Sequence, residues 1–216
     1  MRTDPSAGRL ARRLWILEIV CLIAGVAALG WLVSLRLAAA RDQRDWAREL
    51  ETQLAARHSG LDSTNSPITP VGSGTMATRT RATSGIIGRI EAPRLGISVI
   101  TREGTDAATL ERAVGHIAYT ALPGEPGNAA FAGHRDTFFR GLRQVRTGDR
   151  IAVTTRSGRH EYVVRDTRVV SPDDVSVLDP TPTPTLTLVT CFPFRYIGPA
   201  PERFIVRADL WPNAAR

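Results

Sequence analysis

The feature that most limits the possible folds of this chain is a long apolar run near its N-terminus. It covers residues 14–35 (LWILEIVCLIAGVAALGWLVSL), in which Glu18 is the only charged side chain. At about 1.5 Å per residue, a helix of this length crosses a hydrocarbon core roughly 30 Å thick. Glu18 lies one turn inside the run, within reach of the interface, and Trp15 and Trp31 lie near its two ends, as interfacial aromatic residues do. The run therefore predicts a transmembrane helix.

The charges around this run predict its orientation. Residues 1–13 contain four Arg and one acidic residue, whereas the Arg residues that follow the run alternate with Asp42 and Asp45. Because basic residues favour the cytoplasmic side, we expect residues 1–13 to be cytoplasmic and the rest of the chain to be extracytoplasmic. A cleaved signal peptide is the alternative, since LAAAR at residues 37–41 resembles a cleavage site, but the run is longer than the usual apolar region of about 7 to 15 residues. Both interpretations export the remainder of the chain.

The basic residues are all arginine. The chain has 28 Arg, no Lys and a formal net charge of +7. No basic stripe with interleaved aromatic residues is visible, so the sequence predicts no nucleic-acid partner. Without lysine, no side-chain amine of this chain can serve as a nucleophile or accept an acyl group.

Composition divides the exported part into two regions. Residues 36–84 are expected to form a juxtamembrane helix, with Trp46, Leu50 and Leu54 spaced four apart, followed from residue 59 by a flexible linker rich in Ser, Thr, Gly and Pro. Residues 85–212 contain at least six short strand-like segments separated by Gly and Pro, which is typical of a single β-barrel or sandwich domain. The segments are two strands in GRIEAPRLGISVIT, one in NAAFAGH, a hairpin about Ser157 and Gly158, and the strands TLTLVTC and RFIVRADL; one helix is expected in DAATLERAVG, capped by Asp106 and ended by Gly115.

Cys191 is the only thiol outside the apolar run. In TLTLVTC the period of two places Leu186 and Leu188 on one face and Cys191 on the other. If the leucines face the core, Cys191 faces outward at the end of the strand. A lone thiol in an exported domain, with no intramolecular disulfide partner there, is either intermolecular or reactive.

Four histidines could activate this thiol, and their positions separate them. His58 lies in the juxtamembrane segment and His160 beside the hairpin turn, and both positions are typical of solvated surface residues. His116 follows the expected helix, where a structural hydrogen-bonding role is favoured. His134 ends the apolar run AAFAG, so like Cys191 it lies where a buried strand reaches the surface. His134 is therefore the candidate partner of the thiol.

An acyl enzyme also needs donors for the oxyanion of its tetrahedral intermediate. Arg203 is the first residue of the strand RFIVRADL, twelve residues after Cys191. A loop between the two strands can therefore place Arg203 beside the thiol. The sequence contains no close set of metal ligands, and Asp173 and Asp174 are interpreted as a turn and a helix cap, so no metal and no cofactor are expected. The residues alone indicate an exported, membrane-tethered β domain with a Cys-His acyl-transfer site.

Three motifs make the chain similar to a known family. TLTLVTC resembles the TLxTC signature of sortases, AGHRDTFF resembles their catalytic-histidine segment, and PERFIVRA is similar to the strand that carries their catalytic arginine. The order and spacing of His, Cys and Arg agree, and the resemblance extends from about Ile87 to Leu210. The details HRDTFF and TCFPF look most like class D.

This resemblance implies an all-β fold, a closed eight-stranded barrel with one or two short helices. It also implies a cysteine transpeptidase that cleaves an LPxTG-like sorting signal through a thioester and transfers the substrate protein to an amine of the cell envelope. Cys191 would be the nucleophile, His134 the general acid and Arg203 the oxyanion and substrate clamp. Thr190 would help to position the substrate.

Two other functions are compatible with the same residues. The chain could be a tethered β-barrel that binds peptides or cell-wall material and has an inert thiol. It could also be a hydrolytic cysteine peptidase, which would differ from a transpeptidase only in its acceptor.

Overall fold

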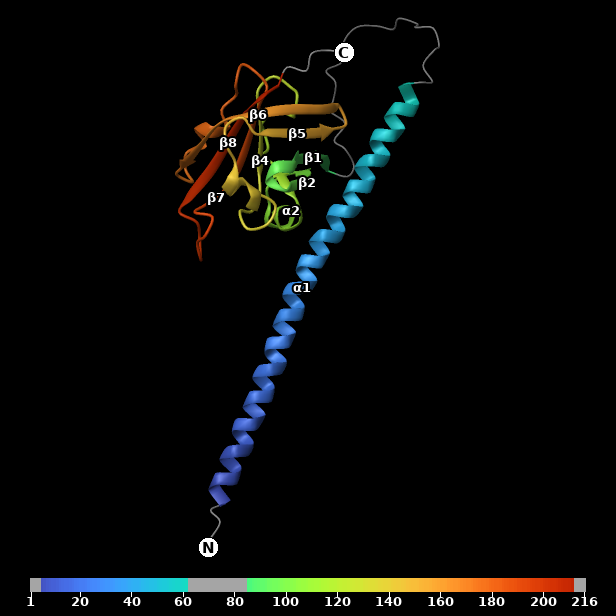
Figure 1. The fold of residues 1–216 in the computed structure, drawn as a ribbon. Coiled ribbons are helices and arrows are strands. Elements are labelled where there is room, and N and C mark those ends of the chain that lie inside the picture. Colours follow the sequence, from blue (N-terminus) through green and yellow to red (C-terminus); the bar gives the residue numbers. More distant parts are fainter. Residues whose placement is uncertain (1–4, 62–84, 212–216) are drawn as a thin grey trace, which may run out of the picture. The chain divides into compact units, whose positions relative to one another are not determined.

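A computed structural model describes residues 5–61 and 85–211 (Figure 1). A single helix, α1 (Pro5–Leu61), precedes eight strands and one further α-helix. The chain divides into two compact units, Met1–Arg41 and Asp42–Arg216. The flexible linker expected from residue 59 falls mostly outside the described residues, although residues 59–61 belong to the last turn of α1.

The second unit contains a closed barrel with strand order β1-β2-β3-β4-β7-β8-β6-β5, in which both antiparallel and parallel strand pairs occur. Most neighbouring strands are antiparallel, but β2 pairs with β3 and β4 pairs with β7 in parallel. The eight-stranded closed barrel implied by the family resemblance is therefore confirmed. The strands are β1 (Ile86–Ala92), β2 (Ile97–Glu103), β3 (Val114–His116), β4 (Asn128–Ala132), β5 (Arg150–Thr155), β6 (Gly158–Val170), β7 (Thr185–Phe192) and β8 (Glu202–Leu210); the short helices are α2 (Ala107–Arg112) and the 3-10 turns η1 (Pro93–Leu95), η2 (Arg140–Gln144) and η3 (Val175–Leu178).

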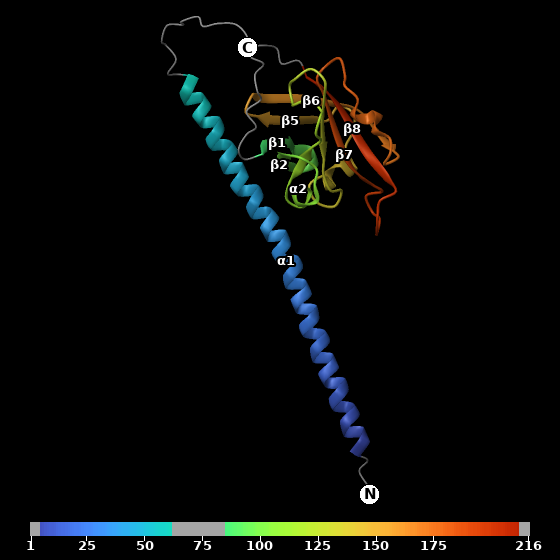
Figure 2. The same cartoon turned by 180° about the vertical axis from the view of Figure 1, so that it is seen from behind.

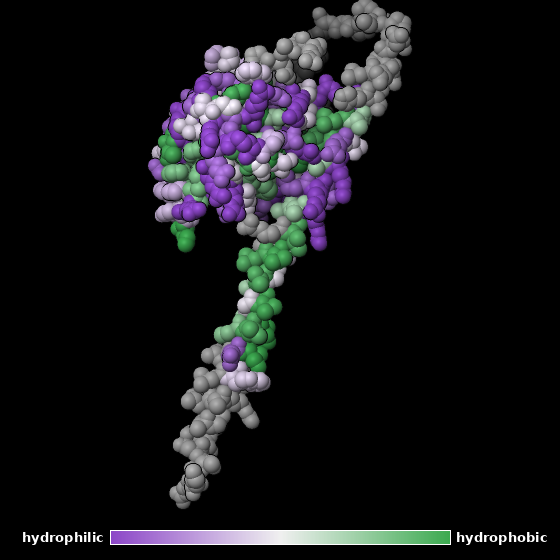
Figure 3. All heavy atoms as spheres, viewed as in Figure 1, coloured by the Kyte–Doolittle hydropathy of each residue, from purple (hydrophilic) through white to green (hydrophobic). Residues whose placement is uncertain are grey.

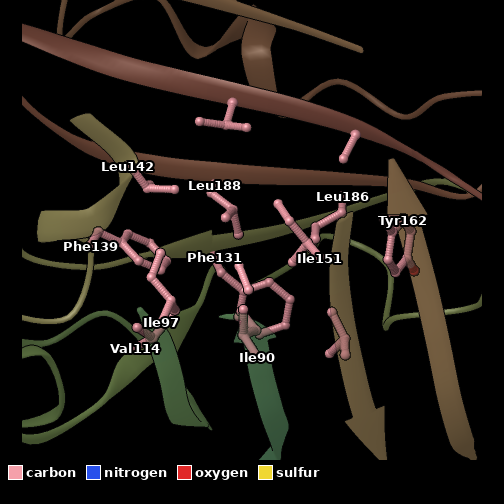
Figure 4. Packing of buried hydrophobic residues seen from close by; sticks show 14 of the residues in the cluster. Ile90, Ile97, Val114, Phe131, Phe139, Leu142, Ile151, Tyr162, Leu186 and Leu188 are labelled. Carbon is pink, nitrogen blue, oxygen red and sulfur yellow. The ribbon is translucent and has the colours of Figure 1, made fainter. Parts of the chain in front are cut away.

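The barrel interior is filled by apolar side chains from every strand. Figure 4 shows Phe131, Ile151, Leu186 and Leu188 converging there with Phe139 from outside the strands. All five side chains are at most 1% exposed. Burial of this kind contributes about 1.5–3 kcal/mol for each large side chain, and it fixes the inward face of each strand.

The region after β2 shows one difference from the sequence-based expectation. Asp106 caps α2 as expected, its carboxylate accepting a hydrogen bond from Thr109 N at 3.0 Å. The helix ends at Arg112, however, and Val114 to His116 form the short strand β3 parallel to β2. The expectation of a helix up to Gly115 was therefore wrong, because Val114 is fully buried in the barrel and follows the sheet instead of the helix.

Helix α1 contains the apolar run. It is long and apolar enough to cross a membrane, judged by length and composition alone, and none of the side chains in its most apolar window is buried. Hydrophobic residues follow one another along part of this helix in Figure 3, whereas the visible surface of the barrel is mostly hydrophilic.

The portion of α1 that belongs to the second unit packs against the barrel. Leu50, with Trp46 and Leu54 beside it, contacts Ile86 and Ile100 of β1 and β2. Gln43 adds polar contacts: its Oε1 accepts from the backbone N–H of Ile100 at 2.7 Å. The spacing of four that predicted this helix thus corresponds to its face toward the barrel.

The hairpin about Ser157 and Gly158 is confirmed by the antiparallel pairing of β5 and β6. His160 differs from expectation, since it is half-buried and not a solvated surface residue. Its ring packs against Gly124, and its Nε2 lies 3.2 Å from Ser157 Oγ. Burial lowers the pKa of His160, as desolvation disfavours the imidazolium.

Candidate active site

Cys191 lies at the end of β7 on the outer face of the barrel. Leu186, Leu188 and Thr190 alternate into the interior, with exposed fractions of 0%, 1% and 2%. Cys191 is on the opposite face and is half-buried, and it forms no disulfide. The outward direction expected from the strand period is therefore confirmed.

Arg203 lies beside Cys191 on the neighbouring strand. Strands β7 and β8 run side by side in both views (Figures 1 and 2), and their antiparallel register pairs Cys191 directly with Arg203. Directly paired residues project from the same face of a sheet, about 5 Å apart. Arg203 is half-buried, and its Nη1 donates to the carbonyl oxygens of Glu202 and Ala200 at 3.1 and 3.3 Å. These bonds hold the guanidinium at the strand end.

His134 approaches Cys191 from the other side. Strand β4 is parallel to β7, with Ala132 opposite Val189, and the ladder continues because Gly133 N donates to Val189 O at 3.1 Å. One residue further, His134 lies at the level of Cys191, and its side chain is exposed. The structure thus brings Cys191, His134 and Arg203 to one end of three adjacent strands.

The segment after His134 folds back on itself. Phe139 N donates to His134 O at 3.0 Å, and the Phe139 ring is fully buried. A methyl group on Gly133 would lie 2.9 Å from Phe139 Cδ2, so only glycine leaves room for this close approach. The backbone on both sides of His134 is therefore fixed by packing and hydrogen bonds.

Thr190 occupies an interior position. Its hydroxyl donates to Gly133 O at 2.7 Å, a buried hydrogen bond between β7 and the residue before His134. The role in substrate positioning expected for Thr190 stays a prediction. The hydrogen bond adds a contact that the sequence did not reveal, one that links the Cys191 strand to the His134 segment.

A short turn covers the outer face of β7 on the side away from Cys191. The turn η3 is capped by Asp174, which accepts from Ser176 N at 3.2 Å, as its interpretation as a helix cap predicted. Asn128 Nδ2 and Arg207 Nη2 donate to Val177 O at 3.0 and 3.2 Å. Burial lowers the pKa of Arg207, and the neighbouring arginines lower it further. These contacts bind η3 to β4 and β8.

Other titratable residues lie elsewhere. The structural role expected for His116 is confirmed: it is 3% exposed, its Nδ1 lies 2.9 Å from Glu103 Oε2 and its Nε2 lies 3.0 Å from Ala121 O. The side chain of His58 is outside the described part of the molecule. Within residues 5–61 and 85–211, no group of three or more His, Cys, Asp or Glu side chains could hold a metal ion.

A comparison with protein families supplies the decisive observation. The sortase domain family matches residues 90–211, which is more than half of the chain and runs from the middle of β1 past the end of β8. The chain belongs to the sortase family. Its matched region includes the three motifs that suggested the family.

Individual sortases are similar over the same region. Sortase D of Bacillus subtilis is 37% identical over 120 residues, which cover 55% of this chain and 61% of that protein. Sortase A of Listeria monocytogenes is 31% identical over 110 residues, 49% of each chain. A solved Clostridium perfringens sortase D5 transpeptidase superposes with a TM-score of 0.57 at 27% identity, covering 76% of this chain and 94% of that one. The expected likeness to class D is confirmed, and the chain spans about three fifths or less of these curated relatives.

One residue near the site was missed by the sequence analysis. Arg135, directly after His134, reaches the loop between β7 and β8, where its Nη2 donates to Tyr196 O at 2.9 Å. The two residues are 61 positions apart, and Arg135 is one of 28 arginines. Only its place in the segment HRDTFF could have singled it out.

Proposed function

We propose that this sortase is a membrane-anchored cysteine transpeptidase. The observation that carries the proposal is the row of residues at the ends of β4, β7 and β8. Cys191 is paired with Arg203 on one side, and the hydrogen bonds of Gly133 hold His134 at its level on the other. A thiol, an imidazole and a guanidinium on one open face are the groups that acyl transfer requires.

The chemistry follows from these positions. The Cys191 sulfur, as thiolate, attacks the carbonyl carbon of the peptide bond to be cleaved, and negative charge develops on the carbonyl oxygen. Arg203, which stays protonated, donates to this oxyanion. When the intermediate collapses, the C–N bond breaks and His134 gives its proton to the leaving amine. The product of this half-reaction is a thioester between Cys191 and the substrate.

An amine then completes the cycle. His134, now neutral, accepts a proton from the incoming amine, which attacks the thioester carbonyl through a second oxyanion held by Arg203. The C–S bond breaks and the thiolate leaves with the substrate joined to the amine. Water can replace the amine, in which case the same residues hydrolyse the substrate.

The proposed substrates and location are those that membership of the sortase family implies. An LPxTG-like sorting signal is the proposed donor and an amine of the cell envelope, in the wall or on a pilin-like protein, the proposed acceptor. The helix at residues 14–35 anchors the enzyme, with the N-terminus inside and the barrel outside. Anchoring keeps enzyme, exported substrate and acceptor at the same surface.

The test uses the full chain in lipid nanodiscs with a library of LPxTG-like peptides and an amine such as triglycine. Wild-type protein and the matched control Cys21→Ala, which changes the other free cysteine, are expected to give transfer product. Cys191→Ala is expected to give neither transfer nor hydrolysis while circular dichroism shows an unchanged fold. Undiminished transfer by Cys191→Ala would reject the proposal, and cleavage without any amine incorporation would identify a peptidase instead.

A further inference from the structure

The loop that connects the two reactive strands is held by an arginine from a third segment. Residues 193–201 contain neither helix nor strand, and their tip is exposed, with Ile197 100% and Tyr196 48% accessible. Arg135 Nη2 donates to Tyr196 O at 2.9 Å and to Gly198 O at 3.5 Å. Its guanidinium carbon also lies 5.9 Å from the centroid of the Tyr196 ring, a cation–π distance.

This contact joins two parts of the site. Arg135 is adjacent to His134, whose segment is fixed to β7 through Gly133. The loop leaves β7 just after Cys191 and returns at Arg203. The Arg135 side chain therefore links the His134 segment to this loop.

The bonds of Arg135 are distinct from those that hold the reacting groups. Sheet pairing fixes the backbones of Cys191 and Arg203, and it does not depend on the loop tip. Freeing the loop would leave the nucleophile in place and would change the position of Tyr196 and Ile197. Those two side chains form an exposed apolar surface on the loop that follows Cys191, suited to contact a bound peptide.

One nitrogen of the Arg135 guanidinium is buried without a hydrogen bond. Among the described residues, Arg135 Nη1 is shielded from solvent and has no hydrogen-bond partner. A buried donor without an acceptor lowers stability, so the contact is poorly explained as a purely stabilising one. Residues that break a local rule in this way are expected at functional sites.

We propose that Arg135 is a positioning residue that clamps the β7–β8 loop to the His134 segment and so forms one wall of the peptide-binding groove. This inference rests on the proposed transpeptidase function, and it assigns Arg135 to substrate binding and not to the chemical steps. The ligand recognised by this wall is the proposed sorting-signal peptide, through an apolar side chain that contacts Tyr196 and Ile197.

The test compares Arg135→Met, which keeps the length of the side chain, with Arg156→Met in full-length protein in nanodiscs. Arg156 is exposed on the turn between β5 and β6, outside the loop and the site, so it is the matched control. The assay is hydrolysis, without amine, of the peptide that the wild type cleaves best in the library. We expect KM to rise about tenfold in Arg135→Met, the scale of one lost charge-assisted contact, with kcat within about twofold and no change in Arg156→Met. Arg135→Lys, which keeps the charge but not the forked geometry, should lie between them.

Hydrogen exchange provides a second readout that does not depend on activity. Amides of residues 193–201 should exchange faster in Arg135→Met than in wild type, while those of β7 and β8 stay protected. Unchanged exchange in the loop, or an unchanged KM, would overturn the clamp. A wild type that forms no thioester and cleaves no peptide would instead refute the proposed function, and the exchange experiment would still decide whether Arg135 holds the loop.

Discussion

Replacing Thr190 by valine isolates one hydrogen bond at the site. Valine has nearly the shape of threonine, so it fills the same interior space between Leu188 and the end of β7. The change removes the donor to Gly133 O, which is 2.7 Å from the hydroxyl in a buried setting. Because Gly133 precedes His134, the lost hydrogen bond loosens the backbone beside His134 and leaves the side chains of Cys191 and Arg203 chemically unchanged.

The expected magnitude follows from burial. Thr190 is 2% exposed and Gly133 is buried, so water cannot readily replace the lost donor. A buried acceptor left without a partner costs about 1–3 kcal/mol in the free energy of unfolding. The loosened His134 segment should lower kcat by roughly ten- to a hundredfold, as small misplacements of catalytic groups do.

Urea unfolding of a soluble fragment beginning at Asp42, the first residue of the second compact unit, measures the stability term, and peptide hydrolysis measures kcat and KM. Thr190→Ser retains the hydroxyl and should remain close to wild type in both. A Thr190→Val variant as stable as wild type, with only KM raised, would refute the anchoring role and support direct contact between Thr190 and the substrate.

Two further predictions concern packing and pH. Gly133→Ala places a methyl group 2.9 Å from the buried Phe139 ring and should lower the free energy of unfolding by about 1–3 kcal/mol. Adding Phe139→Leu to this variant should recover part of the lost stability. A Gly133→Ala variant as stable as wild type would argue against the tight contact. The hydrogen bond from Arg94 lowers the pKa of Asp149, so its stabilising effect is present above the ordinary Asp pKa of about 4 and is lost as pH falls through the lowered value. The free energy of unfolding of Arg94→Gln, measured from acidic to neutral pH, should therefore be lower than that of wild type at neutral pH and equal to it in acid. A difference in the free energy of unfolding that grows in acid would contradict this assignment.

Much of the barrel could be predicted from the sequence because its strands have strong local signals. The alternation of Leu186 and Leu188 with Cys191 predicted both the strand and the outward thiol, since the two leucines face the core and Cys191 lies on the opposite face. Asp106 predicted the start of α2 because a cap is a local interaction. Each of these signals lies within a few residues of the feature that it predicts.

The remaining features depend on pairing between distant segments. Strand β3 has only three residues, and the sequence around Val114 continues a helical pattern, so nothing local distinguishes it from the end of α2. The parallel pairing of β4 with β7, which aligns His134 with Cys191, joins residues more than fifty positions apart. The contact between Arg135 and Tyr196 is equally remote. The reactive residues could be selected from the sequence, but the hydrogen bonds that hold them together could not.

The proposed transpeptidase requires that Cys191 at the end of β7 forms the acyl bond to the substrate. Intact-mass spectrometry of the full chain, quenched in acid during turnover of its best peptide and then mapped by proteolysis, measures this directly. We predict a mass increase equal to the N-terminal fragment of the cleaved peptide less one water, carried by the proteolytic fragment that contains Cys191 and released by hydroxylamine. Turnover with the adduct on another residue, or turnover of the wild type with no adduct on Cys191, would contradict this assignment.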